Sequence, residues 1–191
     1  MILPYDGIYP LIDETAFIAP GAVVVGRVEI GAHASIWYNS VIRGDVDTVK
    51  IGAMTNIQDG SILHEHAGFP LVVGERVTVG HRVLLHGCTI EDDAYIGMGS
   101  IILNGARVCK GAVVGAGSLV LQGMVIPAGM LAVGSPARVV RAIKESEVDR
   151  FYGAVGRYQK MAKMHYPLME KQRVFKPGHD QEPRGKNEIN Q

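Results

Sequence analysis

The chain of 191 residues is long enough for one domain with a sizeable core, and its 47% hydrophobic content excludes an intrinsically disordered protein. Lysine plus arginine equals aspartate plus glutamate at 19 each, so no net field favours nucleic acid, acidic substrates or an anionic membrane. Because the opening MILPYDGIYP lacks a secretory pattern and polar residues interrupt every apolar stretch, we expect a cytoplasmic protein that binds neither nucleic acid nor membrane.

A six-residue rhythm of glycines and aliphatic residues begins near residue 11. Upstream units include IAPGAV at residue 18, VGRVEI at 25, IGAHAS at 30, IWYNSV at 36 and IRGDVD at 42. From residue 90 the units run IEDDAY, IGMGSI, ILNGAR, VCKGAV, VGAGSL, VLQGMV and IPAGML. Apolar residues six apart drift around a helix, and each short strand can bury its aliphatic residue only by stacking on its neighbours. The period therefore predicts a solenoid of short β-strands.

This pattern resembles the left-handed parallel β-helix of the hexapeptide-repeat family, in which three hexads make one triangular coil. The resemblance implies an all-β fold over residues 1–137, a prism that trimerises, and coils stacked about 4.8 Å apart. The aliphatic residues that open consecutive units should point into the core: Ile96, Ile102, Val108 and Val114. We expect the two cysteines, Cys88 and Cys109, to be buried thiols, since they are too few for a disulfide framework or a zinc ribbon.

Three units are out of step, and such failures of a local rule tend to mark functional sites. The interrupted steps join Ile42 to Ile51, Leu63 to Val73, and Val79 to Leu84. Polar motifs stand beside them: RGD at 43–45, HEHAGFP at 64–70 and GHRVLLH at 80–86.

Counting units around the prism places the histidines of these motifs. If Leu63 lies on the first face, His64 and His86 share that face one coil apart, about 4.8 Å along the stack, where two imidazoles can bind one ion. His81 falls on the third face, so a corner separates it from the pair within one subunit. In a threefold assembly, the third face of one subunit can lie against the first face of the next, and His81 could complete the site there. Three imidazoles around zinc leave a position open for water, as in catalytic sites.

The same count puts Arg43 on the first face, one coil before His64, and Gln58 on the third face, one coil before His81. Both residues should therefore line the expected subunit interface.

Beyond GSPARVV the period changes to three and four residues. The apolar positions are Val148, Phe151, Val155, Tyr158, Ala162 and His165. We expect an amphipathic helix within residues 138–170 whose aromatic residues pack against the prism, with Ser146 and Asp149 as its N-terminal cap. Residues 171–191 are polar, contain prolines and lack an apolar period, so we expect a mobile tail or peripheral strap.

Three motifs in order, VIRGDV, TNIQDGSILH and VTVGHRVLLHGCTI, resemble the γ-class carbonic anhydrases. The similarity is greatest to the short bacterial branch with phenylacetate-operon and carnitine-operon proteins, and it extends from about residue 5 to the terminal helix. It implies a homotrimer with zinc sites shared between adjacent subunits and with His64, His81 and His86 as ligands; Fe(II) or Co(II) can take the place of zinc. The implied reaction is reversible hydration of a small-molecule substrate, carbon dioxide, by hydroxide that zinc generates from bound water.

The resemblance also assigns roles around the metal. Gln58 matches the catalytic residue that positions the metal-bound water, and Asn56 is its neighbour. Arg43, Asp45 and Asp59 match a salt-bridged cluster at the subunit boundary, and we expect this cluster to be structural.

The chain departs from the family's pattern where proton transfer is concerned. Val46 stands where the best-characterised member has a glutamate, and the loop after His64 is short and carries only one acid. His66, two residues after His64, is expected to be a solvent-facing surface residue, with proton shuttle or extra ligand as alternatives. His33, His165 and His179 have no evident partners in the sequence.

Other functions share this prism. Hexapeptide-repeat acyltransferases use a catalytic histidine base and a coenzyme A slot between subunits, without a metal triad. A zinc-dependent esterase or thioesterase could use the same metal site, and a non-catalytic structural trimer could use the metal only for assembly.

Overall fold

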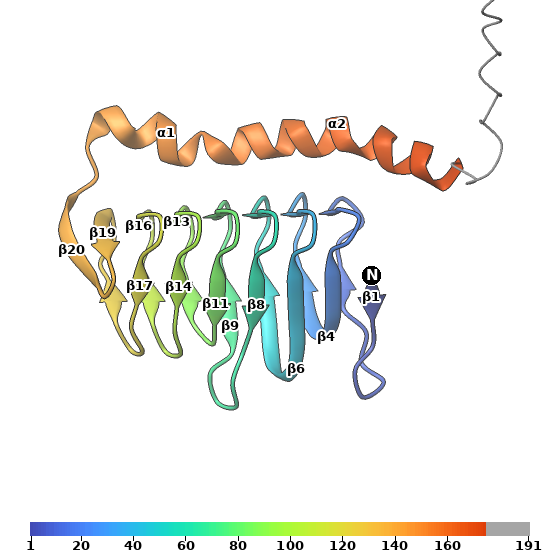
Figure 1. Cartoon of the computed structure of the whole chain (residues 1–191), viewed down its shortest axis with the longest axis horizontal. Helices are drawn as coiled ribbons and strands as arrows, with labels where there is room; N and C mark the ends of the chain where they lie inside the picture. The colour runs from blue at the N-terminus through green and yellow to red at the C-terminus, as the bar shows by residue number, and fades with distance from the viewer. Residues whose placement is uncertain (175–191) are drawn as a thin grey trace, which may run out of the picture.

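Residues 1–174, the part of the chain that the computed structural model describes, form a parallel β-helix with a C-terminal helix along it (Figure 1). Short strands follow one another around three faces and pair in parallel with the strands of neighbouring coils. The predicted fold class, an all-β parallel β-helix followed by an α-helix, is confirmed. Of the tail expected at 171–191, residues 175–191 lie outside the described part, and residues 171–174 belong to the helix.

Each face is a ladder of parallel strands. The first face contains the N-terminal parts of β4 (Val23–Ile30) and β6 (Val41–Ile51), with β1 (Ile2–Leu3), β8 (Ile62–His64), β11 (Leu84–His86), β14 (Ile101–Ile102) and β17 (Leu119–Val120). The second face contains the C-terminal parts of β4 and β6, with β2 (Leu11–Ile12), β9 (Leu71–Val73), β12 (Thr89–Ile90), β15 (Arg107–Val108) and β18 (Val125–Ile126). The third face contains β3 (Phe17–Ile18), β5 (Ser35–Ile36), β7 (Asn56–Ile57), β10 (Thr78–Val79), β13 (Tyr95–Ile96), β16 (Val113–Val114) and β19 (Met130–Gly134).

The core is a column of aliphatic side chains inside the prism. The four residues predicted to point inward, Ile96, Ile102, Val108 and Val114, are each 0% exposed. Burial of one such side chain contributes about 1.5–3 kcal/mol, so the repeated column supplies most of the driving force for folding. Cys88 is buried as expected, whereas Cys109 is only half-buried, because Val108 beside it takes the inward position.

The expected early start at Leu84 is wrong. Leu84 is half-buried on the outside of the prism, and Leu85 fills the core at 0% exposed, six residues after Val79. The shortened step instead separates Leu85 from Ile90. Either Leu84 or Leu85 could open the hexad as far as the sequence shows, and only burial in the structure distinguishes these two phases.

The two longer interruptions become corners between the first and second faces. At the first of them β6 bends within one continuous strand, and the register against β4 shifts after Gly26. Gly44 is required here, since a Cβ on it would stand 2.5 Å from the carbonyl oxygen of Arg27. The second interruption is the loop at 65–70, which projects from the prism between β8 and β9 (Figure 1).

The chain leaves the prism by a strand rather than directly by a helix. β20 (Ala137–Ala142) pairs antiparallel with β19 and lies at the edge of the third-face sheet. A 3-10 turn, η1 (Glu145–Glu147), then leads into α1 (Val148–Tyr152) and α2 (Ala154–Val174). The expected cap by Ser146 and Asp149 is wrong: the Glu147 carboxylate accepts the backbone N–H of Lys144 at 3.0 Å and two hydrogen bonds from Arg141. The hydrogen bonds from Arg141 hold the pKa of Glu147 at about 2.

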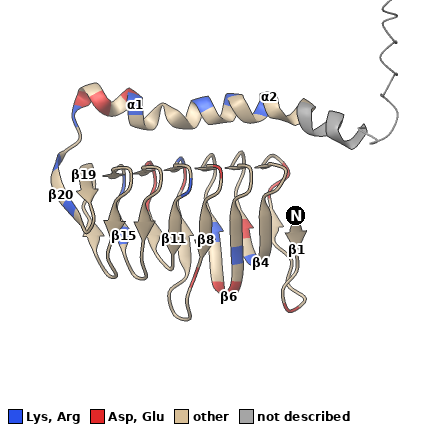
Figure 2. Cartoon of the chain, viewed as in Figure 1, with Lys and Arg blue, Asp and Glu red and all other residues tan. Residues whose placement is uncertain are grey.

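Helix α2 lies along the third face (Figure 1). Tyr152, in α1, donates a hydrogen bond to the carbonyl oxygen of Gly111 at 2.7 Å, and Tyr166 donates one to that of Ala16 at 3.0 Å. Lys and Arg residues and Asp and Glu residues are both spread along the coils, whereas the described part of α2 is coloured only for Lys and Arg (Figure 2). Within residues 1–174, no helix has the length and apolar character that a membrane span requires.

Candidate metal centre

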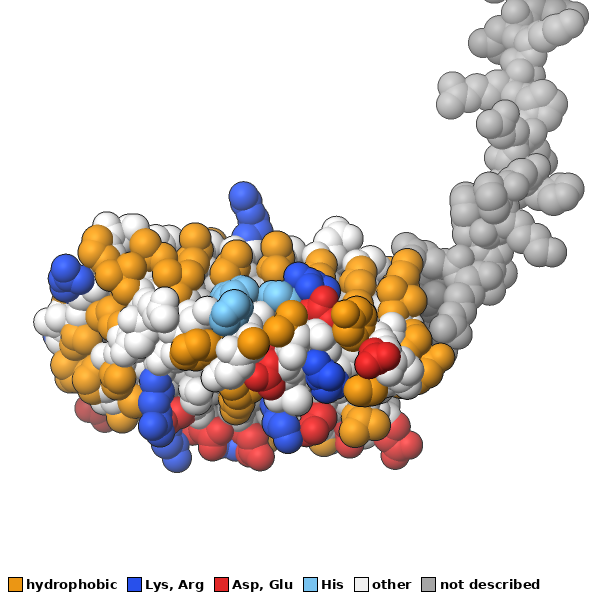
Figure 3. Space-filling view, turned by 90° about the horizontal axis from the view of Figure 1, so that it is seen from below, with side chains coloured by type: hydrophobic (Ala, Val, Ile, Leu, Met, Phe, Trp, Pro, Cys, Tyr) orange, Lys and Arg blue, Asp and Glu red, His pale blue; other side chains and the backbone are white. Residues whose placement is uncertain are grey.

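His64 and His86 lie side by side on the first face. The parallel register pairs them directly, and both imidazoles point outward because their neighbours Leu63 and Leu85 fill the core. Nδ1 of His64 is 3.2 Å from Nε2 of His86, and the ring centroids are 5.2 Å apart. Figure 3 shows histidine side chains gathered on this side of the molecule among hydrophobic ones.

The outer nitrogen of each imidazole is held by an oxygen. Nε2 of His64 lies 2.9 Å from Oδ1 of Asp45, and Nδ1 of His86 contacts the amide oxygen of Asn104. Because carboxylate and amide oxygens are acceptors, the outer nitrogens carry the protons in the neutral rings and the two facing nitrogens carry lone pairs. Two lone pairs 3.2 Å apart repel each other unless a cation lies between them.

These residues fit a zinc ion. Two ligand nitrogens at about 2.0–2.1 Å from a tetrahedral zinc are separated by about 3.3 Å, close to the 3.2 Å between His64 and His86. Metal-binding histidines commonly donate their other N–H to a carboxylate or carbonyl oxygen, which fixes the tautomer. His64 through Nδ1 and His86 through Nε2 could therefore hold one metal ion together.

His81 lies at the corner between the third and first faces, in the turn after β10. Its Nδ1 is 2.9 Å from Oδ2 of Asp59, and its Nε2 is 3.5 Å from the hydroxyl of Tyr158. Within residues 1–174, no hydrogen bond or ring contact joins His81 to His64 or His86. The side chain of His81 is 42% exposed, against 17% for that of His64.

The three charged residues expected to form one cluster form two separate pairs within the subunit. Arg43 bonds Asp45 beside His64, whereas Asp59 bonds His81 at the other corner. Partial burial of Asp45 opposes its ionisation, but hydrogen bonds from Arg43 and His64 outweigh burial and lower its pKa. Asp45 is therefore an ionised partner for the His64 ring.

Gln58 and Asn56 are both buried at the third-face corner. The amide nitrogen of Gln58 donates to Oδ1 of Asn56 at 3.1 Å, and the amide nitrogen of Asn56 donates to Oγ1 of Thr78 at 3.0 Å. This chain of donors fixes the orientation of both amides and leaves the side-chain oxygen of Gln58 without a protein donor among the described residues.

His66 and Val46 are both exposed near the pair. The ring centroid of His66 is 6.4 Å from that of His86, and His66 also faces Phe69 in the short 65–70 loop. The Val46 side chain has no ionisable group, and Val46 is 48% exposed.

The sequence reasoning missed two residues that hold the centre. Glu65 is 0% exposed; its Oε1 accepts the backbone N–H groups of Val46 and Asp47 at 2.7 and 2.8 Å, and so fixes the corner that carries Asp45. Its other oxygen, Oε2, has no hydrogen-bond partner among the described residues and lies 3.7 Å from Nε2 of His64. Strand alternation after Leu63 could have placed Glu65 inside.

The second missed residue is Asn104, which lies in the coil after His86. Counting one further coil from His86 could have found it, because the steps beyond residue 90 are regular. Asparagine is common at turns, so nothing in the sequence marks Asn104 as a partner of His86.

An aromatic cluster lies between α2 and the third face. The rings of Phe17 and Tyr158 both pack against the ring of Trp37, with centroid distances to it of 5.1 and 5.2 Å. His165, for which the sequence indicated no partner, packs on Trp37, and its Nδ1 lies 2.7 Å from the hydroxyl of Tyr38. His33 lies in a turn where Thr15 accepts its backbone N–H, and His179 is outside the described residues. Tyr158 thus connects the helix cluster to His81.

Comparisons with known proteins agree with this fold. A family model described as bacterial transferase hexapeptide (six repeats) matches residues 9–44 and 87–122. The chain is 48% identical to a carbonic anhydrase of Geobacillus kaustophilus over 84% of its own length and 91% of the relative's. It is 43% identical to γ carbonic anhydrase 1 of Arabidopsis thaliana mitochondria over 82% of its own length, but spans only 59% of that relative.

A solved structure from Bacillus cereus, named as a candidate acetyltransferase, is also similar. It superposes with a TM-score of 0.86 at 44% identity and covers 87% of this chain and 97% of its own. Three observations point to the same family. These are the hexapeptide repeats, the paired histidines and the sequence identity to named carbonic anhydrases over most of their length. This chain therefore belongs to the γ-class carbonic anhydrase family.

Proposed function

We propose that this protein is a zinc-dependent enzyme of the γ-class carbonic anhydrase type, which hydrates carbon dioxide reversibly at sites shared between the subunits of a homotrimer. One observation carries the proposal. Each of the three histidines has one ring nitrogen held by an oxygen, from Asp45, Asn104 or Asp59; the other nitrogens of His64 and His86 face each other, and that of His81 contacts the Tyr158 hydroxyl at 3.5 Å.

The proposal of a shared site follows from the position of His81. His81 lies at the corner of the third and first faces, away from the pair, so a second subunit must bring a His81 to each pair. An apolar strip next to His81 supports such a contact: Ile62, Met98 and Ile101 are 47%, 55% and 40% exposed. Contiguous exposed apolar side chains of this kind are typical of subunit interfaces.

The residues of the chain would divide the work as follows. Zinc bound by His64, His86 and a neighbouring His81 would supply hydroxide at neutral pH by lowering the pKa of a water ligand to about 7. Gln58, whose amide is oriented by Asn56, would accept a hydrogen bond from that ligand and so orient it toward carbon dioxide. Asp45 and Arg43 would keep the His64 ring in place.

The sequence predicts that export of the proton from the metal site is slow. Val46 cannot carry a proton, and we propose that diffusible buffer carries it unless His66, exposed near His86, does so. We expect slow hydration with kcat rising with the concentration of an imidazole buffer, while kcat/KM stays nearly constant. Val46→Glu should raise kcat in dilute buffer and flatten its dependence on buffer.

Stopped-flow hydration by zinc-loaded protein tests the activity. A rate no higher than that of the metal-free protein at every buffer concentration would exclude carbonic anhydrase activity. Val46→Gln serves as the matched control, because it adds a polar side chain of similar size without a group that can exchange a proton. Equal stimulation by glutamate and glutamine would contradict the proton-transfer explanation.

The acyltransferase alternative has one observation in its favour, the similarity to the Bacillus cereus structure named as a candidate acetyltransferase. Assays with acetyl-coenzyme A and amine acceptors, and with simple esters, on the same zinc-loaded sample separate acyl transfer and hydrolysis from hydration. Zinc binding without turnover of any of these substrates would favour a structural trimer.

A further inference from the structure

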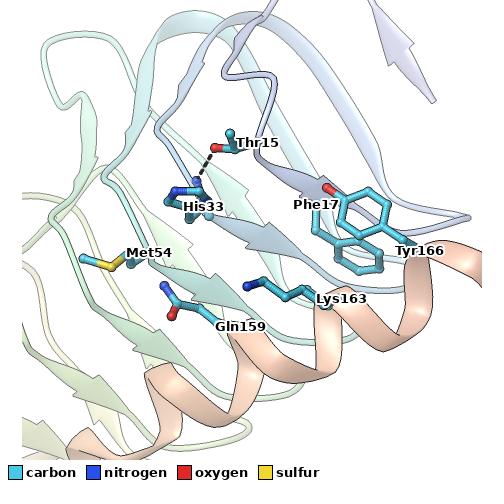
Figure 4. A pocket seen from close by; sticks show the side chains of 9 residues that line it. Thr15, Phe17, His33, Met54, Gln159, Lys163 and Tyr166 are labelled. Atoms are coloured by element: carbon cyan, nitrogen blue, oxygen red, sulfur yellow. Dashed lines mark hydrogen bonds between the residues drawn. The ribbon is translucent and has the colours of Figure 1, made fainter.

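A cavity of about 270 Å³ lies between α2 and the third face, well separated from the histidine pair (Figure 4). The turns before β3, β5 and β7 form one wall, and one side of α2 forms the other. Phe17, Met54 and Tyr166 supply apolar lining. The volume is close to the lower end of the range of small-ligand sites, roughly 300–1,000 Å³. A ligand with one ring would therefore fill it.

The polar side chains that line this cavity each have at least one donor group, and none is a carboxylate: Thr15, His33, Gln159, Lys163 and Tyr166. Figure 4 shows Gln159 and Lys163 extending from α2 toward His33 on the opposite wall. Lys163 has no ion-pair partner among the residues that the structure describes, and no acidic side chain lines the cavity. Two acids, Asp13 and Glu14, directly precede Thr15 in the chain, and neither lines the cavity; Asp13 directs its carboxylate to Thr15 and accepts both its N–H and its hydroxyl. An ammonium group without a counter-ion beside further donors favours an anion.

The cavity is at the opposite edge of the third face from His81. Thr15, His33 and Met54 belong to turns between the second and third faces, whereas His81 and Gln58 lie between the third and first faces. The subunit contact that the metal site needs involves the first face and the His81 corner. The cavity mouth is therefore outside that contact.

We propose that this cavity binds a small organic carboxylate with one apolar ring. Lys163, with Gln159 and His33, would hold the carboxylate, and the ring would lie against Phe17, Met54 and Tyr166. The lining explains both preferences, because the donors gather at one place and the rest of the wall is apolar. This site is independent of the metal centre and of the proposed hydration reaction.

The chain provides its own reporter. Trp37 is the only tryptophan, and its ring lies 5.1 Å from that of Phe17 in the cavity wall. We would titrate metal-stripped full-length protein with benzoate, following Trp37 emission, and measure Kd on the same samples by calorimetry. Benzamide, which has the same shape without the charge, is the ligand control. We expect a saturable change in emission with benzoate and at least about tenfold weaker binding of benzamide.

Two variants and one control separate this site from others. Lys163→Met and Gln159→Glu should each weaken benzoate binding by about tenfold or more, through loss of the ammonium and gain of a repelling charge respectively. Lys160→Met removes an exposed lysine from the same helix outside the cavity and should leave Kd unchanged. His64→Ala, which disables the metal centre, should also leave Kd unchanged.

Several outcomes would overturn the proposal. These are no binding of benzoate, equal Kd values for benzoate and benzamide, heat of binding without a change in Trp37 emission, or equal effects of Lys163→Met and Lys160→Met. Binding that requires zinc or His64 would assign the anion to the metal centre instead. None of these results depends on whether the protein hydrates carbon dioxide.

Discussion

The acceptor oxygens behind the histidines decide what the metal centre can bind. A neutral imidazole has one nitrogen that donates and one that accepts, and the partner of the donor determines which is which. At His86 that partner is Asn104, a neutral residue, whereas His64 and His81 have carboxylates. The amide oxygen of Asn104 fixes the ring of His86 without adding a charge.

Removing that acceptor should weaken the metal site without harming the fold. We expect Asn104→Leu to lower zinc affinity by about 10–100-fold, the usual effect of losing such a partner, because the His86 ring can then rotate or change tautomer. Competition with a chromophoric chelator measures the affinity. Asn104→Asp is the matched control: it retains an oxygen at the same place and should bind zinc nearly as well as the natural protein. Equal loss in both variants would contradict the role of the oxygen.

At this scale the sequence predicted the residues that follow the repeat and missed those that depend on its corners. His64 and His86 were paired by counting, because a coil returns to the same face. Glu65 was missed because its buried carboxylate is stabilised by backbone N–H groups of residues 46 and 47, and a backbone donor has no signature in the sequence. Arg43, Asp45 and Asp59 form two separate pairs within one subunit, and the cluster expected across the subunit boundary stays a prediction.

At the scale of the strand, the phase of the hexad determines which side chain is inside. Val108 and Val125 both belong to strands of the second face, but Val108 is 0% exposed and Val125 is 54% exposed. Val108→Asp should abolish soluble folding, since a buried unpaired carboxylate costs several kcal/mol. Val125→Asp should leave the melting temperature within a few degrees of the natural value. Circular dichroism melts and soluble yield check both, and a folded Val108→Asp protein would contradict the assigned phase.

Two regions show where the six-residue period does not predict the structure: the hexads around residues 79–90 and the start of the C-terminal helix. Consecutive hexads from residue 90 were assigned correctly because every unit has an aliphatic opening residue and a turn with glycine, or with Asp93 in the first unit. Around residues 79–90 two leucines in succession, Leu84 and Leu85, satisfied the pattern equally, and burial resolved them. The helix cap was wrong because Glu147 is bonded to Arg141 on β20, a strand that the change of period concealed.

For the whole molecule, the proposed shared metal site makes a prediction about mixtures. In the proposed homotrimer, His64→Ala or His81→Ala alone would destroy every site. When the two variants are co-expressed, a His81→Ala subunit still has the pair, and an adjacent His64→Ala subunit still has His81. Random mixing leaves one intact site in each mixed trimer, so total zinc should recover to about a quarter of the natural content.

The matched control combines His64→Ala with His86→Ala. Both variants lack a member of the pair, so no arrangement of these subunits restores a site. Zinc is measured by mass spectrometry on trimers that carry two different affinity tags; these are all mixed trimers, so they should hold about a third of the natural content. Recovery in both mixtures, or in neither, would argue against a site formed between subunits.

The chain sequence did not predict how the helix lies on the prism. Its apolar period indicated a helix with one packed side, and any of the three faces could have received it. Two aromatic residues of the third face contact the helix: Trp37 packs against Tyr158 and Phe17 packs against Tyr166, and these contacts select that face. Contacts between residues more than a hundred positions apart are set by shape, which a local pattern does not contain.

The C-terminal helix and the stack of coils beside it have nearly equal repeat lengths. Coils repeat about every 4.8 Å and helical turns about every 5.4 Å. Tyr152 and Tyr166 anchor to Gly111 and Ala16, and the interval is about 21 Å of helix against about 24 Å of stacked coils. Because one coil and one helical turn have nearly the same length, a shift of the helix by one turn would place each side chain over the next coil with almost the same fit. The polar anchors at the two ends, rather than apolar packing, therefore set the alignment, and any change in coil number between them must be matched by about one helical turn per coil.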